Sequence, residues 1–149
     1  MRKSSRKNLK ASILFCIIFI SLVVINFSVS VCEIEPADNQ VILYEHSNYG
    51  GSYIILAYDR DVNNISYWHT DSGKSWNDKL SSLKVGKDAK VTLYEHKDYN
   101  EKGCKITITG DCNNNKNIPK LSSYNMKKGK SWNDQVTSLK VRMADCATN

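Results

Sequence analysis

The sequence Gly73-Lys-Ser-Trp-Asn-Asp-Lys-Leu-Ser-Ser-Leu-Lys-Val85 occurs a second time, slightly altered, as Gly129-Lys-Ser-Trp-Asn-Asp-Gln-Val-Thr-Ser-Leu-Lys-Val141. Each copy is preceded by another matching block, Val41-Ile-Leu-Tyr-Glu-His46 before the first and Val91-Thr-Leu-Tyr-Glu-His96 before the second. Repetition at such a period indicates duplicated supersecondary units that bury their apolar faces against each other. We therefore expect two structural repeats over residues 41 to 142, each too short to be a domain alone.

The two pairs of blocks are separated by different lengths of chain. The first pair recurs after 50 residues and the second after 56, so the second repeat contains about six additional residues. The run Asn113-Asn-Asn-Lys-Asn117 is the obvious place for them, because clustered asparagines are typical of a polar loop.

Within the repeats, apolar residues recur with a period of two. Val41 and Leu43 alternate with Ile42 and Tyr44, and similar alternation covers residues 106–109 and 139–143. This pattern predicts half-buried β-strands, and glycine-containing turns separate them. Beyond the first thirty residues no stretch has a sustained helical period. The sequence therefore predicts an all-β fold, a sandwich of two sheets.

Two kinds of motif occur in the repeats: Tyr44-Glu-His-Ser-Asn-Tyr-Gly-Gly51 in the first hairpin, and the paired loops Asn77-Asp-Lys-Leu-Ser-Ser82 and Asn133-Asp-Gln-Val-Thr-Ser138. The first is similar to the aromatic signature of a Greek key hairpin in the βγ-crystallin superfamily, and the loops are similar to the calcium motif of that superfamily. The chain resembles in particular its calcium-binding, microbial members outside the eye lens. The resemblance implies a domain at 41–143, with Greek keys at about 41–86 and 90–143, a lead-in at 31–40 and a tail at 144–149.

The second hairpin departs from the family pattern. Tyr94 and Tyr99 match, but Glu101 stands where the first repeat has Gly51, and the nearest glycine is Gly103. The family needs a glycine there because the backbone adopts a conformation that most side chains cannot reach. We expect either that two inserted residues restore the glycine or that the second hairpin is irregular.

The motif residues suit calcium, which takes six to eight oxygen ligands from carboxylates, carbonyls and hydroxyls. A single copy would be interpreted as an ordinary turn, but two copies in matching context favour two Ca²⁺ sites. The resemblance implies that each site combines the acidic part of one loop with the hydroxyl of the other, and that hairpin carbonyls complete it. The expected ligands are Asn77, Asp78, Lys79 (by its carbonyl) and Thr137 with one ion, Asn133, Asp134, Gln135 (by its carbonyl) and Ser81 with the other, and the carbonyls of Glu45 and Glu95.

The first thirty residues are typical of an export signal. Five Lys or Arg residues precede an apolar run from Ile13 to Phe27, and Ser28-Val-Ser30 offers a cleavage site. A signal peptide at 1–30 and an uncleaved signal anchor are both open, and either leaves the remaining chain outside the cell. The leader also accounts for most of the net charge of +6, since the rest has 16 basic and 15 acidic residues. Nucleic acid is therefore not an expected partner.

The four cysteines beyond the leader predict two disulfides with three possible connectivities. Cys104 and Cys112 flank a short run and could close a hairpin, in which case Cys32 and Cys146 would join the two ends.

Several tempting sites have simpler interpretations. His46 and His96 each lack a second nitrogen or sulfur ligand at useful spacing, so we expect exposed histidines and no zinc site. Gly73-Lys-Ser75 lacks the earlier glycine of a phosphate loop, and the Ser81-x-x-Lys84 pair lies in an expected strand. We expect Trp76 and Trp132 to be core residues.

We therefore expect no enzyme, but a secreted calcium-binding domain whose two ions stabilise the fold, with a structural, stress-related or extracellular binding role. The alternative is an extracellular interaction effector on the same fold, such as an adhesion or lectin-like module, a protease inhibitor or a toxin. Its protein or glycan partner would be recognised by exposed loops, for instance around Tyr67-Trp68.

Overall fold

The computed structural model describes residues 33–146 and contains eight strands. The strands of the first repeat are β1 (Gln40–His46), β2 (Gly50–Ala57), β3 (Arg60–Val62) and β4 (Ser82–Val85). Those of the second are β5 (Ala89–Tyr94), β6 (Lys105–Thr109), β7 (Lys116–Ile118) and β8 (Ser138–Met143). Short 3₁₀ helices lie between them: η2 (Ser47–Tyr49), η3 (Ile65–Tyr67), η4 (Lys97–Tyr99), η5 (Leu121–Ser123) and η6 (Lys127–Gly129).

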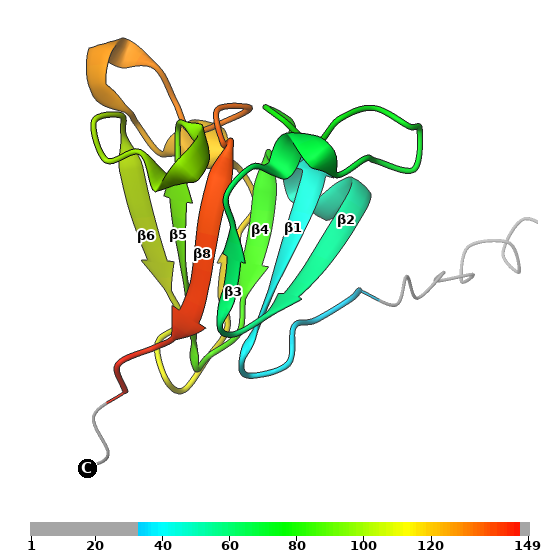
Figure 1. The fold of residues 1–149 in the computed structure, drawn as a ribbon. Coiled ribbons are helices and arrows are strands. Elements are labelled where there is room, and N and C mark those ends of the chain that lie inside the picture. Colours follow the sequence, from blue (N-terminus) through cyan, green and yellow to red (C-terminus); the bar gives the residue numbers. More distant parts are fainter. Residues whose placement is uncertain (1–32, 147–149) are drawn as a thin grey trace, which may run out of the picture. The chain divides into compact units, whose positions relative to one another are not determined.

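The strands form two four-stranded sheets, with the orders β2-β1-β4-β7 and β3-β8-β5-β6 (Figure 1). All pairings are antiparallel. Each repeat gives its third strand to the sheet of the other repeat, since β3 pairs with β8 and β7 pairs with β4. This exchange is the Greek key connection, and it confirms the expected all-β fold of two sheets.

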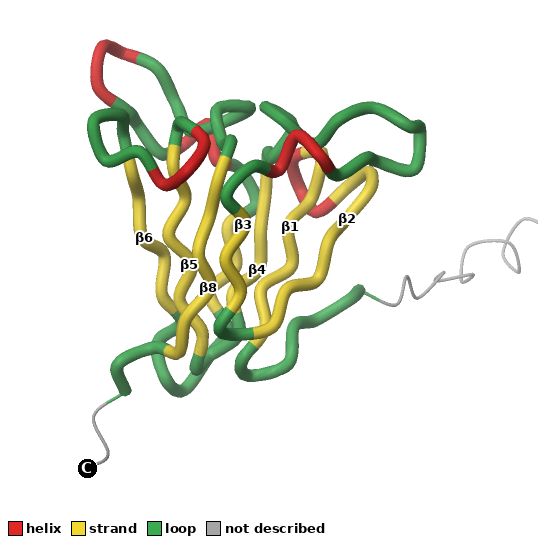
Figure 2. Tube along the Cα trace, in the orientation of Figure 1, coloured by secondary structure: helices red, strands yellow, loops and turns green. Residues whose placement is uncertain are grey.

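The short helices gather at one end of the sandwich, as do the longest loops (Figure 2). β4 and β8 begin at this end (Figure 1). The calcium-like motifs run directly into these two strands, because Ser82 begins β4 and Ser138 begins β8. The duplicated fold therefore brings both motifs to the same end of the molecule.

The core lies between the sheets and contains the inward residues of every strand. Trp76 and Trp132 are 1% and 2% exposed, which confirms that the tryptophans before the two motifs are core residues. Each is held in place by its own backbone, because Trp76 N–H donates to the carbonyl of Trp68 and Trp132 N–H to that of Tyr124.

The prediction that the strands are half-buried is correct for β6 but wrong for β1 and β4. Every residue from Val41 to Tyr44 is buried, as is every residue of β4. The reason is that the segment preceding β1 covers the outer face of their sheet. The ammonium group of Lys84, whose residue is fully buried, donates to the carbonyl of Ile34 at 3.0 Å and pairs with Glu35 at 2.5 Å.

The additional residues of the second repeat do not lie in one loop as expected. Tyr53 in β2 and Lys105 in β6 occupy equivalent positions, opposite Tyr44 and Tyr94, so two extra residues already precede β6. The others lie before β7, and Lys116 and Asn117 of the asparagine-rich run belong to that strand.

The connectivity that pairs Cys104 with Cys112 and Cys32 with Cys146, one of the three left open by the sequence, is wrong. Cys112 is bonded to Cys146, with a Cα–Cα distance of 5.7 Å, and Cys104 is a free thiol. Cys104 and Cys112 flank the extended strand β6, whose five residues alone span about 17 Å. That separation is too long for a disulfide, which needs Cα atoms within about 7 Å.

The expected leader at 1–30 and Cys32 lie outside the described residues. Among residues 33–146, no helix is both long enough and apolar enough to cross a membrane.

Candidate functional site

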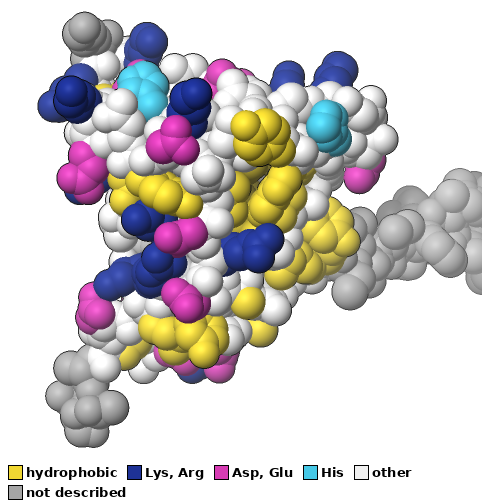
Figure 3. All heavy atoms as spheres, in the orientation of Figure 1, with side chains coloured by type: hydrophobic (Ala, Val, Ile, Leu, Met, Phe, Trp, Pro, Cys, Tyr) yellow, Lys and Arg dark blue, Asp and Glu magenta, His cyan; other side chains and the backbone are white. Residues whose placement is uncertain are grey.

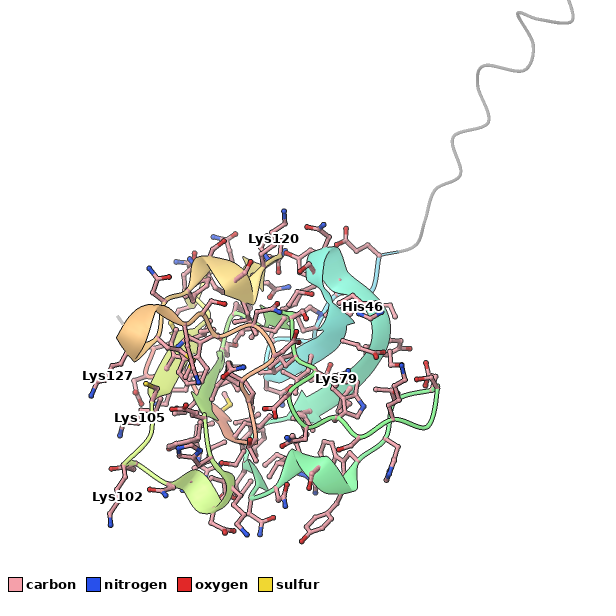
Figure 4. All side chains as sticks on the ribbon, turned by 90° about the horizontal axis from the view of Figure 1, so that it is seen from above. His46, Lys79, Lys102, Lys105, Lys120 and Lys127 are labelled. Atoms are coloured by element: carbon pink, nitrogen blue, oxygen red, sulfur yellow. A yellow bond between two sulfur atoms is a disulfide. The ribbon has the colours of Figure 1, made fainter. Side chains whose placement is uncertain are left out.

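The two motif loops lie at the end of the sandwich that Figure 4 views from above. Lys79, in the first loop, lies toward the middle of this end, whereas Lys102 and Lys127 point outward at its rim (Figure 4). The first loop therefore lies toward the middle of this end, and the turns of the second repeat that carry Lys102 and Lys127 lie at its rim.

Each loop has the same backbone conformation at its acidic residue. Asp78 and Asp134 have φ values of 53° and 54°, in the left-handed region. Aspartate tolerates that region better than most residues, because its short side chain can bond nearby backbone groups. In both loops the preceding asparagine donates its side-chain N–H to the aspartate, at 2.6 Å for Asp78 and 2.7 Å for Asp134.

The loops contact each other directly. Ser81 Oγ of the first loop donates to Asp134 Oδ1 of the second at 3.1 Å, and the two residues are 53 positions apart. The backbones are linked in both directions, because Asp134 N–H donates to the Leu80 carbonyl and Asp78 N–H to the Val136 carbonyl. The structure thus brings the hydroxyl of one motif to the carboxylate of the other.

The hairpins that were expected to contribute carbonyls lie next to these hydroxyl residues. Ser81 N–H donates to the Tyr44 carbonyl at 3.1 Å, and Thr137 N–H donates to the Tyr94 carbonyl at 3.0 Å. Glu45 and Glu95 directly follow those tyrosines. The expected ligands therefore form two groups. One contains Glu45, Ser81 and the acidic part of the second loop. The other contains Glu95 and Thr137 and lies beside the loop of Asp78.

The side chains of Glu45 and Glu95 form hydrogen bonds within their own hairpins. Glu45 Oε2 accepts the N–H of Ser52 at 3.4 Å, and Glu95 Oε2 accepts that of Cys104 at 3.0 Å. The bond from Cys104 N–H lowers the pKa of Glu95 below its usual value, with a smaller contribution from the charge of His96. These side chains fold back onto their own repeats, which favours the backbone oxygen of each residue as the candidate ligand.

The second hairpin is completed by Gly103, so of the two alternatives the first is correct: two inserted residues restore the glycine. A Cβ at Gly103 would lie 2.6 Å from the His96 ring, just as one at Gly51 would lie 2.8 Å from the His46 ring. Only Gly51 also has a positive φ, of 75°. Glycine is thus required at both positions because the histidine ring packs on the backbone there.

Two site residues were not predicted from the sequence, the last serine of each motif. Ser82 Oγ donates to the His46 carbonyl at 2.6 Å and accepts the Tyr49 N–H at 3.0 Å. Ser138 makes the same bonds to His96 and Tyr99, at 2.6 and 3.2 Å. Each motif therefore holds the hairpin of its own repeat in place, and the recurrence of this serine in both motifs is the sequence signal that could have identified it.

Negative charge accumulates between the loops. Loss of hydration raises the pKa of Asp78 above its usual 3.8, and the nearby charge of Asp134 raises it further. A cation placed between the loops would relieve this repulsion.

The available donors are mainly oxygen atoms that carry no charge. Among residues 33–146, no three His, Cys, Asp or Glu side chains gather closely enough to hold a metal ion. The candidate ligands are one carboxylate and one amide from each loop, together with hydroxyl and carbonyl oxygens. This donor set fits Ca²⁺, which accepts neutral oxygens in flexible geometry. A surface cavity of about 640 Å³ adjoins Thr137 and is also lined by residues of the second hairpin: His96, Lys97, Asp98 and Asn100.

The sequence-family comparison finds a match to Beta/Gamma crystallin over residues 37–128. A comparison with curated protein sequences finds no match. One similar solved structure, from work on the evolution of the eye lens βγ-crystallin domain fold, is 23% identical with a TM-score of 0.57, covering 77% of this chain and 96% of its own.

Two microbial structures are also similar. Spherulin 3a from Physarum polycephalum is 24% identical with a TM-score of 0.52, and the match covers 78% of this chain and 95% of that one. A βγ-crystallin domain from Clostridium beijerinckii is 28% identical with a TM-score of 0.48, and covers 68% and 95%.

Proposed function

Because this chain belongs to the βγ-crystallin family, and because its two motif loops lie against each other, we propose that it binds two calcium ions that stabilise the fold. The observation that carries the proposal is the 3.1 Å contact between Ser81 Oγ and Asp134 Oδ1. It joins a hydroxyl and a carboxylate from separate repeats, which is the pairing that shared sites require.

One ion would be held by Asp134, the Gln135 carbonyl, Ser81 and the Glu45 carbonyl. The other would be held by Asp78, the Lys79 carbonyl, Thr137 and the Glu95 carbonyl. Asn77 and Asn133 donate hydrogen bonds to the aspartates and would add amide oxygens. Because each ion would bridge both repeats, its binding would favour the folded chain over the unfolded one. If the dissociation constant were about 10 µM and free calcium about 1 mM, each site would stabilise the fold by about 2.7 kcal/mol.

The proposed role is structural and lies outside the cell. The basic head and apolar run of residues 1–30 support export, and calcium in the millimolar range is an extracellular condition. No catalytic activity is part of the proposal: the site offers ligand oxygens whose function would be to hold the two repeats together.

Calorimetric titration of the purified protein with Ca²⁺ tests the proposal, and two ions per chain is the expected stoichiometry. Asp78→Asn and Asp134→Asn should each weaken one site and reduce the calcium-induced rise in melting temperature. Asp71→Asn is the matched control, because Asp71 is an exposed acidic residue in a turn outside both loops. The proposal would be wrong if millimolar Ca²⁺ produced neither heat nor a change in melting temperature in the unsubstituted protein.

A further inference from the structure

Strand β2 forms one edge of its sheet and has an unusual composition for an edge. Among residues 33–146 it pairs only with β1. Its eight residues, Gly-Gly-Ser-Tyr-Ile-Ile-Leu-Ala, include no charged residue and no proline. Proteins normally protect long edge strands with charge, proline or a bulge, because unpaired backbone groups invite pairing with another chain. β2 has one such device at its start, a register shift against β1 between Gly50 and Tyr53, so the unprotected edge is the regular stretch from Tyr53 to Ala57.

The other three edge strands carry that protection. β3 and β7 have three residues each and contain Arg60 and Lys116, respectively. β6 is the counterpart of β2 in the second repeat, and there Lys105 takes the position of Tyr53, opposite the equivalent tyrosine of the neighbouring strand. Since the two repeats share one fold, the absence of charge in β2 is a property of its sequence that the architecture does not require.

The free backbone groups of β2 can be identified from its register with β1. Tyr58 N–H donates to the Asn39 carbonyl at 3.0 Å, one position beyond the Gln40–Ala57 pair. Because hydrogen-bonded pairs alternate along an antiparallel ladder, Ile54 and Leu56 also bond to β1. The N–H and C=O groups of Tyr53 and Ile55 therefore point away from the sheet, toward its edge.

The side chains of the same two residues lie on the outer face. Tyr53 is 48% exposed and Ile55 is 46% exposed, although both are large and apolar. Figure 3 shows hydrophobic side chains gathered over the side of the molecule where Figure 1 draws β1 and β2, whereas Lys, Arg, Asp and Glu predominate over β5, β6 and β8. Outward backbone groups and exposed apolar side chains thus coincide on one strand.

We propose that β2 is a self-association edge, at which two copies of this chain pair antiparallel about a twofold axis through Ile54. In this register Tyr53 lies opposite Ile55 of the second copy, and each pair exchanges two backbone hydrogen bonds. Beyond these pairs Ala57 would face Gly51, where the register shift and the positive φ of 75° end the regular strand. The two four-stranded sheets then form one continuous sheet.

A second copy fits this edge for two reasons. A twofold axis brings each outward-pointing residue opposite another outward-pointing residue, so the hydrogen-bond pattern is complementary to itself. The strand also brings no like charges together, since it has none, and it forms an aromatic–β-branched pair of the kind that stabilises sheets. At β6 the same symmetry would bring two copies of Lys105 close together. The contact involves one strand from each copy, so we expect a reversible dimer in the range of small, weak interfaces.

Disulfide trapping tests this register directly. At the axis, Ile54 lies opposite its own copy in a pair that is not hydrogen-bonded, where Cα atoms are about 4.5 Å apart. A disulfide can form at that distance. In Ile54→Cys, oxidation should therefore produce a covalent dimer on a non-reducing gel, well above the background of the unsubstituted protein. The matched control is Ile106→Cys, because Ile106 is the equivalent residue of β6 and is also partly buried against the core.

A second pair of substitutions tests the role of the side chains. Adding Tyr53→Lys and Ile55→Thr to Ile54→Cys gives β2 the outward residues that β6 carries at Lys105 and Thr107. Circular dichroism should stay unchanged, because both positions are exposed, and the trapped fraction should fall to that of the β6 control. The proposal is overturned if Ile54→Cys stays monomeric, the result expected if β2 instead pairs with a different protein. It is equally overturned if Ile106→Cys is trapped to the same extent, or if the added substitutions leave trapping unchanged.

Discussion

Replacing Ser82 by alanine should destabilise the first repeat through its hairpin. The Ser82 hydroxyl is fully buried and joins the two ends of η2, because it donates to the His46 carbonyl and accepts the Tyr49 N–H. Asn48 and Tyr49 both have positive φ values, of 57° and 62°, so the turn depends on bonds that hold an unfavourable backbone conformation.

The magnitude follows from those two bonds. A hydrogen bond contributes a net ~0.5–1.5 kcal/mol to stability, and a buried polar group left without a partner costs ~1–3 kcal/mol. Ser82→Ala removes two bonds and leaves two backbone groups to find other partners. His46 is exposed, so water can reach its carbonyl more readily than the Tyr49 N–H. We therefore expect a loss of about 2–4 kcal/mol, from a total that is typically about 5–15 kcal/mol.

The assay is urea unfolding followed by tryptophan fluorescence, since Trp76 and Trp132 are buried and report on both repeats. Ser138→Ala should cause a similar loss, because its two hydrogen bonds match those of Ser82. Ser122→Ala, at an exposed position in η5, should change stability by less than about 0.5 kcal/mol. If Ser82→Ala were no more destabilising than Ser122→Ala, the conclusion that the Ser82 hydrogen bonds stabilise the hairpin would be refuted.

Two further predictions concern the region around the disulfide. Replacing Cys146 by serine opens a loop of 34 residues, which the chain-entropy relation equates with a loss of about 4 kcal/mol, whereas Cys104→Ser should have little effect on the same urea curves. Two backbone N–H groups hold the pKa of Asp111 below its usual 3.8, so its carboxylate stabilises the fold above that pH and this contribution is lost as the pH falls through the folded-state pKa. Asp111→Asn should consequently be less stable than the unsubstituted protein at pH 7, and this difference should shrink as the pH is lowered below 3.8; a difference that stayed constant over that range would contradict this account.

The sequence was sufficient to predict the architecture because the chain contains two copies of one unit, which can be compared with each other. Matching blocks around Trp76 and Trp132 located two repeats, and the period of two identified strands without reference to any contact. It was also sufficient to select Ser81 and Asp134 as candidate ligands. It was not sufficient to predict burial. The period of two over Val41 to Tyr44 predicted a half-buried strand, yet all four residues are buried because a separate segment covers the outer face of the sheet.

What the sequence determined by itself was local: which segments are strands, where the turns lie and which residues occur twice. These follow from the spacing of side chains along one strand, and that spacing is independent of what packs on it. Only the tertiary structure decided the long-range features that the repeats do not indicate, among them the Cys112–Cys146 disulfide and the position of β2 at a sheet edge. Each of these depends on how the strands are ordered in space, because the Greek key exchange brings together residues that are far apart in the chain.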